Sequence, residues 1–359
     1  MSIEAVNLDR RPTIAFAMGD PAGISPELAA KLINLDEIRA AAQLVVFGDR
    51  RILQKGAEVA GVTLDIDVIA PSDSVPTVSS RPILVDLGNL SLDQVTPSVA
   101  TLEGGQFATD NFRHALRFAA EGNADAVFFT PFNKKAMRLA YPGYDDEIRF
   151  VRDVLQVAGP ASEFNVLDNI WNARVTSHIP VSKIAQSISE DAILRGLVLT
   201  EATMRSAGFP SPRIAVAGLN PHAGDGGNFG REEIDIIEPA VQRAAKMGLV
   251  VDGPFPADTV FLRVKNGDYD AVLTMYHDQG QIAMKLMGFD RGVTLIGGFP
   301  FPICTPAHGT AYEIAGRGIA NIGASRQALL LAIRMVSGSA ARRSSTEGFI
   351  PISAGAFAS

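Results

Sequence analysis

The sequence lacks the features that mark secreted and membrane-spanning proteins. Cys304 is the only cysteine among 359 residues, so no disulfide can form within the chain and a reducing compartment is expected. No apolar run approaches the roughly 18 residues that a membrane helix needs. Residues 1–10 carry acidic side chains and no apolar core, which argues against a signal peptide. We therefore expect a cytoplasmic protein.

Positive charge is also in short supply. The chain has 32 lysines and arginines against 39 aspartates and glutamates, a formal net charge of −7. Nucleic acids and anionic membranes attract proteins through basic surfaces, so neither is expected as a partner. The hydrophobic fraction of 47% and charged fraction of 20% are those of an ordinary globular protein, and the length suggests two domains.

Neither a G-x-G-x-x-G turn nor a Walker motif is found in the sequence, which excludes a Rossmann fingerprint and a P-loop as nucleotide sites. Apolar runs of strand length instead alternate with amphipathic helical stretches from one end to the other. This alternation predicts an α/β fold with mostly parallel strands and helices on both faces. The clearest predicted strands are 13–19, 44–48, 82–87, 126–130, 213–219, 271–276 and 293–297, with a hairpin over 166–176.

Three of the five histidines follow predicted strands: His178, His222 and His277. Ligands of open α/β sheets gather at the carboxyl ends of the strands, so these histidines are candidate metal ligands. Imidazole suits Zn²⁺, Mn²⁺, Co²⁺ or Ni²⁺, and a carboxylate usually completes such a site. The competing interpretation is a set of loop histidines that hydrogen-bond to the backbone.

A glycine-rich segment, 224–230, precedes a predicted helix over 231–247. Glycines let backbone N–H groups approach a ligand, and a helix N-terminus favours an anion. Alternatively the segment is a plain turn, because Glu232 and Glu233 already satisfy the helix dipole. The sequence leaves both interpretations open.

Residues 308–321, His-Gly-Thr-Ala-Tyr-Glu-Ile-Ala-Gly-Arg-Gly-Ile-Ala-Asn, closely resemble the adenosine-binding loop of isocitrate and isopropylmalate dehydrogenases. In those enzymes such a loop, and not a Rossmann turn, binds the dinucleotide. The resemblance implies NAD or NADP as cofactor. The residues expected to contact it are His308, Gly309, Thr310, Ala311, Glu313 and Asn321.

Four further segments, 19–27, 218–224, 253–259 and 275–280, resemble motifs of the 4-hydroxythreonine-4-phosphate dehydrogenase family in the right order. The resemblance covers nearly the whole chain. It implies an isocitrate dehydrogenase-like fold, with two α/β/α domains and a cleft between them. It also implies a homodimer in which the second subunit completes each active site.

The same resemblance suggests how the chain is divided. We expect residues 1–130 together with 303–359 to form the cofactor-side domain. Residues 131–302 are expected to form the metal-binding and dimerisation domain.

The family holds its divalent metal with three histidines, one of them from the other subunit. Two of these map onto His178 and His277. The third falls in 144–148, which has no histidine, and an ungapped comparison places Glu147 there. Because a carboxylate can replace imidazole, we expect Glu147 of the second subunit to complete a site for Zn²⁺, Co²⁺, Mn²⁺, Ni²⁺ or Mg²⁺.

The residues expected around the substrate depart from the family pattern. The family binds its phosphate with a lysine, an asparagine and an arginine; here Lys285 matches, but Thr294 and Ile303 replace the other two. Asn133 stands where the family has a histidine. An arginine fork grips phosphate in a bidentate manner, which isoleucine cannot do. We expect Asn133, Lys134, Lys285 and Thr294 to contact a substrate without phosphate.

The chemistry that the resemblance implies is metal-assisted oxidation of a secondary alcohol β to a carboxylate, followed by loss of CO₂. His222, Asp258, Asp278 and Lys285 are candidates for proton transfer or for orienting the groups that perform it. We expect a terephthalate-type cis-dihydrodiol dehydrogenase, whose substrate is a small diol or hydroxy acid. The alternatives are a 4-hydroxythreonine-4-phosphate dehydrogenase, a sugar-acid 4-phosphate dehydrogenase, and a catalytically inactive binding homologue.

Overall fold

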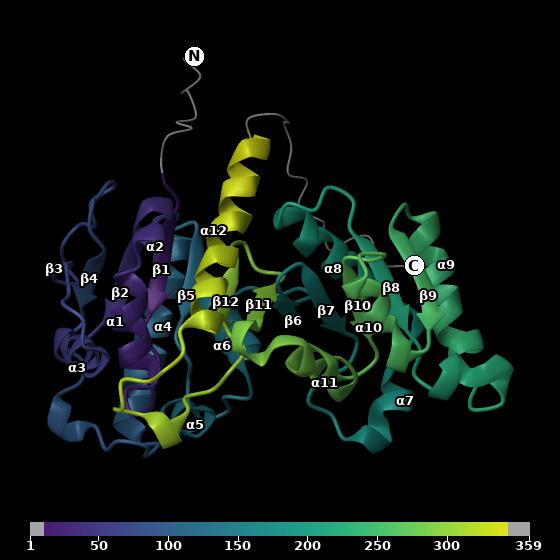
Figure 1. Cartoon of the computed structure of the whole chain (residues 1–359), viewed down its shortest axis with the longest axis horizontal. Coiled ribbons are helices and arrows are strands. Elements are labelled where there is room, and N and C mark those ends of the chain that lie inside the picture. Colours follow the sequence, from purple (N-terminus) through teal and green to yellow (C-terminus); the bar gives the residue numbers. More distant parts are fainter. Residues whose placement is uncertain (1–10, 344–359) are drawn as a thin grey trace, which may run out of the picture.

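The computed structural model describes the backbone of residues 11–343 and the side chains up to residue 337. The N-terminal segment judged above not to be a signal peptide lies outside this range. Twelve strands form one sheet, in the order β3-β4-β2-β1-β5-β12-β11-β6-β7-β10-β8-β9. Helices cover both faces of this sheet along its whole width (Figure 1). The predicted α/β class is confirmed.

The strands are β1 (Thr13–Ala17), β2 (Gln43–Gly48), β3 (Asp67–Ile69), β4 (Ile83–Asp86), β5 (Ala126–Phe129), β6 (Ser162–Leu167), β7 (Ile170–Arg174), β8 (Arg213–Ala217), β9 (Val250–Phe255), β10 (Ala271–Thr274), β11 (Val293–Gly297) and β12 (Ile303–Pro306). The α-helices are α1 (Ser25–Ile33), α2 (Asp36–Ala41), α3 (Arg50–Ala60), α4 (Leu102–Ala120), α5 (Lys134–Ala140), α6 (Glu147–Leu155), α7 (Ile184–Ser187), α8 (Glu190–Ser206), α9 (Glu238–Lys246), α10 (Ala257–Lys265), α11 (His277–Gly288) and α12 (Gly323–Arg343).

The two halves of the sheet are parallel, and they join through antiparallel strands. β3, β4, β2, β1, β5 and β12 run parallel, as do β7, β10, β8 and β9. Between them, β12 pairs antiparallel with β11, β11 with β6, and β6 with β7. The β6–β7 pair is the hairpin that the sequence predicts. Because three successive pairings are antiparallel, the strands of the second half run opposite to those of the first. Residues that follow β5, β7, β10 and β12 nevertheless line one central cleft.

The inner strands of each parallel half are buried on both faces, which explains their nearly continuous apolar sequences, whereas the edge strands β3 and β9 are partly exposed. In β1, Ile14 and Phe16 pack into one core cluster, while Ala15 and Ala17 pack into the cluster on the opposite face. Every residue of β1 is buried. This rigid sheet fixes the loops that carry the candidate site.

Helix α1 begins at Ser25, whose hydroxyl donates to the Pro131 carbonyl oxygen at 2.7 Å. The bond ties the loop after β1 to the loop after β5. In residues 11–343, no helix has the length and apolar character needed to cross a membrane.

Candidate active site

A cleft of about 260 Å³ opens where the antiparallel strands join the two halves of the sheet. Its walls come from β11 and β12, the loop after β5, the start of α6, the loop after β7 and helix α11. Eight residues predicted from the sequence line it: Lys134, Glu147, His178, His277, Lys285, Thr294, His308 and Gly309. The fold thus brings metal-binding, cationic and cofactor-loop candidates to one place.

His178 and His277 form a pair at the centre of this group. Their ring centroids lie 5.7 Å apart, with an angle of 41° between the rings. Zinc–nitrogen bonds of about 2.0–2.1 Å with tetrahedral geometry place two imidazole centroids roughly 5 Å apart. The Nδ1 atom of His277 lies 2.7 Å from an Asp278 carboxylate oxygen. With the proton on Nδ1, Nε2 keeps its lone pair for a metal, so the donor chemistry of the pair fits a divalent ion.

Glu147 lies in the cleft wall of the same chain, in the first turn of α6. Burial raises the pKa of its carboxyl, and the Lys134 ammonium, 3.8 Å away, opposes that shift. Within the described residues, no group of three histidine, cysteine or acidic side chains is arranged to hold a metal. One chain therefore offers two imidazoles, and the assignment of Glu147 as a third ligand from the second subunit stays a prediction.

The cleft is lined by cationic side chains even though position 303 is not an arginine. Lys285 and Lys134 line it together with Thr294. Ile303 does not line it: its side chain is fully buried in the central strand β12, among the apolar residues of one core cluster. Isoleucine at position 303 therefore gives no ground for expecting a substrate without phosphate, because its side chain belongs to the core and not to the cleft.

Glu163, Asn165 and Gln281, which were not predicted from the sequence, also line the cleft. Behind them lies Arg174, whose side chain is only 2% exposed. Its guanidinium donates to a Glu163 carboxylate oxygen, to the Asn165 side-chain oxygen at 2.8 Å and to the Ser177 hydroxyl at 3.0 Å. The Gln281 amide also donates to Asn165, at 2.8 Å. A charged residue at the end of an apolar strand is the signal that could have revealed this network.

The predicted cofactor loop is fastened to helix α1 and to the loop before it. The Tyr312 hydroxyl donates to the Asp20 carboxylate at 2.5 Å, and burial raises the pKa of both groups, so the phenol stays a donor. At the other end of the loop, Ala320 N–H donates to Glu27 at 2.8 Å, and Lys31 donates to the Ala320 carbonyl oxygen at 3.0 Å. These contacts hold His308 and Gly309 at the cleft and leave Glu313 and Asn321 exposed.

His308 is held in one tautomer. Its Nδ1 lies 3.0 Å from the Gly309 carbonyl oxygen, which can only accept, so the neutral ring carries its proton on Nδ1. Burial lowers the pKa of this histidine and favours the neutral form. Its Nε2 atom is buried and has no hydrogen-bond partner among the described residues, which leaves an acceptor available at the cleft wall.

Several other predicted residues lie elsewhere. Asp258 is exposed in the first turn of α10 and does not line the cleft, and Asp278 reaches it only through His277. Asn133 uses its side-chain oxygen to cap α5, accepting from the N–H groups of Lys135 and Ala136 at 3.0 and 3.1 Å. Of the loop residues, Thr310 accepts a hydrogen bond from Ile24 N–H just before α1, and both Thr310 and Ala311 are absent from the lining.

His222 is exposed on a strained loop outside the cleft lining of its own chain. Residues 222–226 are all left-handed, with φ values between 44° and 80°. Three of them, His222, Ala223 and Asp225, are not glycine. A left-handed conformation costs an L-residue about 1–2 kcal/mol, so these three together cost about 3–6 kcal/mol. Such strain persists only where surrounding contacts impose it.

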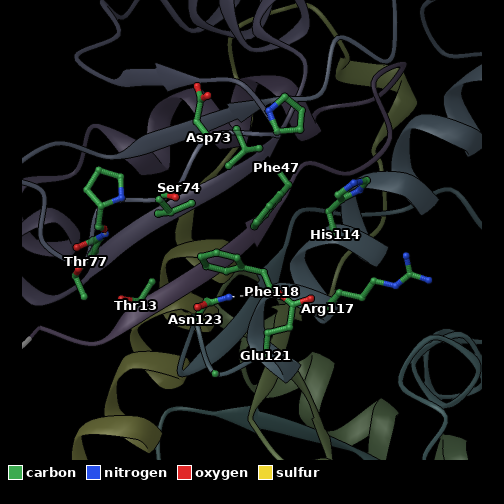
Figure 2. Close-up of a pocket in the computed structure, with 16 residues that line it drawn as sticks. Thr13, Phe47, Asp73, Ser74, Thr77, His114, Arg117, Phe118, Glu121 and Asn123 are labelled. Atoms are coloured by element: carbon green, nitrogen blue, oxygen red, sulfur yellow. Dashed lines mark hydrogen bonds between the residues drawn. The ribbon is translucent and has the colours of Figure 1, made fainter.

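A larger cavity, of about 520 Å³, lies at the opposite edge of the first half of the sheet. Thr13 and Gln43, which begin β1 and β2, help to line it. Figure 2 shows Phe47 and Phe118, with ring centroids 5.4 Å apart, at its centre, and Asp73 and Ser74 on one side. No predicted site residue is among its lining residues in the described chain. The candidate chemistry therefore belongs to the smaller central cleft.

Comparisons with known proteins show the family of the chain. The model of a family described as pyridoxal phosphate biosynthetic protein PdxA matches residues 40–332. A Rhizobium meliloti protein, provisionally named 4-hydroxythreonine-4-phosphate dehydrogenase 2, is 63% identical over 91% of this chain and 94% of its own length. A Halalkalibacterium halodurans protein, provisionally named D-threonate 4-phosphate dehydrogenase, is 34% identical over 91% of this chain and 98% of its own.

A solved structure of 4-hydroxythreonine-4-phosphate dehydrogenase from Klebsiella pneumoniae has a TM-score of 0.78 at 32% identity, covering 90% of this chain and 99% of that one. The fold and these relatives define the chain as an oxidoreductase of the dehydrogenase class. It belongs to the pyridoxal phosphate biosynthetic protein PdxA family. The resemblance drawn from the sequence motifs is confirmed.

The expected terephthalate-type cis-dihydrodiol activity is wrong. A terephthalate 1,2-cis-dihydrodiol dehydrogenase from Burkholderia xenovorans LB400 is 29% identical and has a TM-score of 0.60, below the corresponding values of the phosphate-named relatives. The expectation rested on Thr294 and Ile303, and Ile303 belongs to the core. The findings favour the alternative, a dehydrogenase whose substrate carries a 4-phosphate.

Proposed function

We propose that this chain oxidises a secondary alcohol β to a carboxylate in a small 4-phosphorylated acid, with NAD or NADP as hydride acceptor. The substrate class comes from the relatives, named for 4-hydroxythreonine 4-phosphate and D-threonate 4-phosphate. One observation carries the proposal: Lys285 lines the cleft that contains His178 and His277, and it has no ion-pair partner among the described residues. The unpaired ammonium group of Lys285 can bind a phosphate dianion.

His178 and His277 would hold the divalent metal, with the His277 ring oriented by Asp278. When bound, the ion supplies Lewis-acid polarisation of the substrate's alcohol oxygen. Lys285 and Thr294 would bind the phosphate by charge-assisted and hydroxyl hydrogen bonds. Lys134 would contact the substrate carboxylate, because its ion pair with Glu147 is long, at 3.8 Å.

The loop over residues 307–321 would bind the dinucleotide, with His308 and Gly309 at the cleft and the rest of the loop on α1. When bound, the dinucleotide supplies the acceptor for the hydride of the alcohol carbon. The ketone that results lies β to the substrate carboxylate, so CO₂ can leave. Under this proposal residues 1–130 and 303–359 serve the cofactor, and residues 131–302 serve the metal and the dimer.

We also propose a homodimer whose second subunit completes the metal site. Ile282 and Leu286 of helix α11 and Phe289, the residue after it, are 62%, 83% and 53% exposed, an apolar stripe with helical spacing beside Lys285. Exposed apolar stripes of this kind usually mark an interface. A second copy bound to this stripe would lie next to His178 and His277. Within residues 11–343, one chain offers no third metal ligand beside these two histidines.

The substrate proposal is tested by following NAD⁺ and NADP⁺ reduction with both 4-phosphorylated acids and with unphosphorylated D-threonate. Lys285→Met should lower kcat/KM for the phosphorylated substrates by about 10- to 150-fold, the effect of losing a hydrogen bond of about 1.5–3 kcal/mol to a charged group. Lys135→Met is the matched control, because Lys135 is exposed and does not line the cleft.

Equal kcat/KM for phosphorylated and unphosphorylated substrates would contradict the phosphate assignment. An effect of Lys135→Met as large as that of Lys285→Met would contradict the role of Lys285. A wild-type protein that binds metal and dinucleotide but reduces neither cofactor with any of these acids would revive the catalytically inactive alternative.

A further inference from the structure

We propose that Glu233 is a positioning residue. It fixes the conformation of the loop that carries His222, a candidate for proton transfer. The proposal rests on the function proposed above, in which a second subunit completes the site. His222 is exposed and lies outside the cleft lining of its own chain, so it would serve the site of the second subunit. Glu233 does not line the cleft, and within one chain it contacts none of the candidate metal ligands. Its role follows from how a strained loop is kept in shape.

The backbone of this loop is left-handed at five successive residues, 222–226. Five in a row form a left-handed turn that an L-polypeptide does not adopt unaided. The loop is also exposed, with only Gly224 buried, so packing of its own side chains cannot impose the shape. The constraint must come from the segment that precedes His222 and from whatever lies beneath the turn.

The carboxylate of Glu233 supplies that constraint. One oxygen accepts from the backbone N–H groups of Leu219 and Asn220, both at 2.7 Å, and the other accepts from the Asn220 side-chain amide at 2.9 Å. Leu219 and Asn220 lead directly into Pro221 and His222. With only 3% exposure, Glu233 makes these charge-assisted bonds away from water, where they are strongest. The direction in which the chain enters the turn is thereby fixed.

The turn itself wraps closely around the same carboxylate. A Cβ atom on Gly224 would meet a Glu233 oxygen at 2.7 Å, and one on Gly218 would meet the other oxygen at 3.2 Å. Glycine is thus required at position 224, and a side chain at position 218 would crowd the carboxylate. Since Glu233 already occupies the inside of the turn, the glycine-rich segment is a braced turn, and the alternative of an anion site at this point is not supported.

The helix that carries Glu233 is widened where it starts. Residues Glu233–Ile237 form a π-helical turn before α9 begins, instead of the continuous α-helix expected over 231–247. Single π-helical turns are common at functional sites, because they change the direction of a side chain. Here the buried Glu233 points under the loop, whereas Asp235 of the same turn lies at the surface in an ion pair with Arg231.

The test compares Glu233→Gln with Asp235→Asn, a matched amide substitution in the same π-helical turn. In Glu233→Gln an amide replaces the carboxylate that accepts three hydrogen bonds. The amide NH₂ group then faces another hydrogen-bond donor, so that contact becomes unfavourable. We expect kcat to fall by about tenfold or more, with the dinucleotide KM changed by less than about twofold. Asp235→Asn should leave both values at the wild-type level.

A double-mutant cycle decides whether Glu233 acts through His222. His222→Asn removes the imidazole but keeps a residue that tolerates left-handed backbone. In a His222→Asn background, Glu233→Gln should cause no further loss of kcat, because the two residues act as a unit. Losses that multiply in the double variant would overturn the proposal.

A second readout is independent of turnover and separates this proposal from the proposed function. In protein labelled at histidine, the imidazole NMR resonance that disappears in His222→Asn is that of His222. This resonance should shift in Glu233→Gln and in the milder Glu233→Asp, and stay in place in Asp235→Asn. An unshifted resonance in both Glu233 variants would overturn the positioning role, even if no acid tested is a substrate.

Discussion

Replacing Arg174 tests how much the free energy of unfolding depends on one buried charge behind the cleft. The Arg174 side chain is 2% exposed and binds Glu163, Asn165 and Ser177. Replacement by Met keeps much of the volume but removes every donor. Glu163 then keeps its charge without a partner, 15% exposed at the cleft wall, and the Asn165 oxygen retains only the Gln281 amide.

Breaking a buried ion pair costs about 3–5 kcal/mol, because the remaining charge is desolvated and unpaired. Glu163 keeps some contact with water, which places the expected loss near 3 kcal/mol. Arg149→Met is the control: Arg149 and its partner Asp145 are 51% and 71% exposed, and such pairs are worth less than about 1 kcal/mol. The double variant Arg174→Met, Glu163→Gln should recover most of the loss, since no uncompensated charge remains.

The free energy of unfolding is measured by urea denaturation of the four proteins, monitored by the fluorescence of the buried Trp171. Metal affinity is measured alongside, because His178 and Glu163 line the same cleft. A loss in Arg174→Met no larger than that in Arg149→Met would refute the reasoning. A double variant as unstable as the single one would show that the unpaired Glu163 is not the cause.

Three further predictions concern the metal, the dimer and pH. His277→Ala should lose its bound divalent ion and its turnover, and Glu147→Gln should bind the ion about 1–3 kcal/mol more weakly; full activity in metal-free His277→Ala contradicts the metal site. Leu286→Glu should yield monomers in light scattering, whereas Met247→Glu, equally apolar and 56% exposed, should not. Because burial lowers the folded pKa of His308, the unfolded state takes up a proton that the folded state does not, so stability falls as pH drops below about 6.5. His308→Gln should flatten that part of the stability–pH curve.

The sequence alone was enough to predict most of the strands whose side chains are buried on both faces. Strands such as β1 and β10 are unbroken apolar runs, and parallel sheets covered by helices require such runs. It did not predict β9 or β12, which contain Gly253-Pro254 and Pro306. Proline and glycine argue against a strand locally, yet β9 is an edge strand, where they are tolerated. Only the position of a strand in the sheet shows whether it can tolerate proline and glycine.

Motifs in the sequence also singled out His178, His277, Lys285 and His308, and all four line one cleft. For His178 and His277 the physical reason is that β7 and β10 are parallel neighbours, so the loops that follow them share one edge. The three-dimensional packing decided what those loops face. It buried Ile303 in the core, paired Arg174 with Glu163 and set the Glu233 carboxylate beneath the loop of His222. Each of these contacts joins residues that are not adjacent in the chain, and their register and burial follow from the packing of the whole sheet rather than from local sequence.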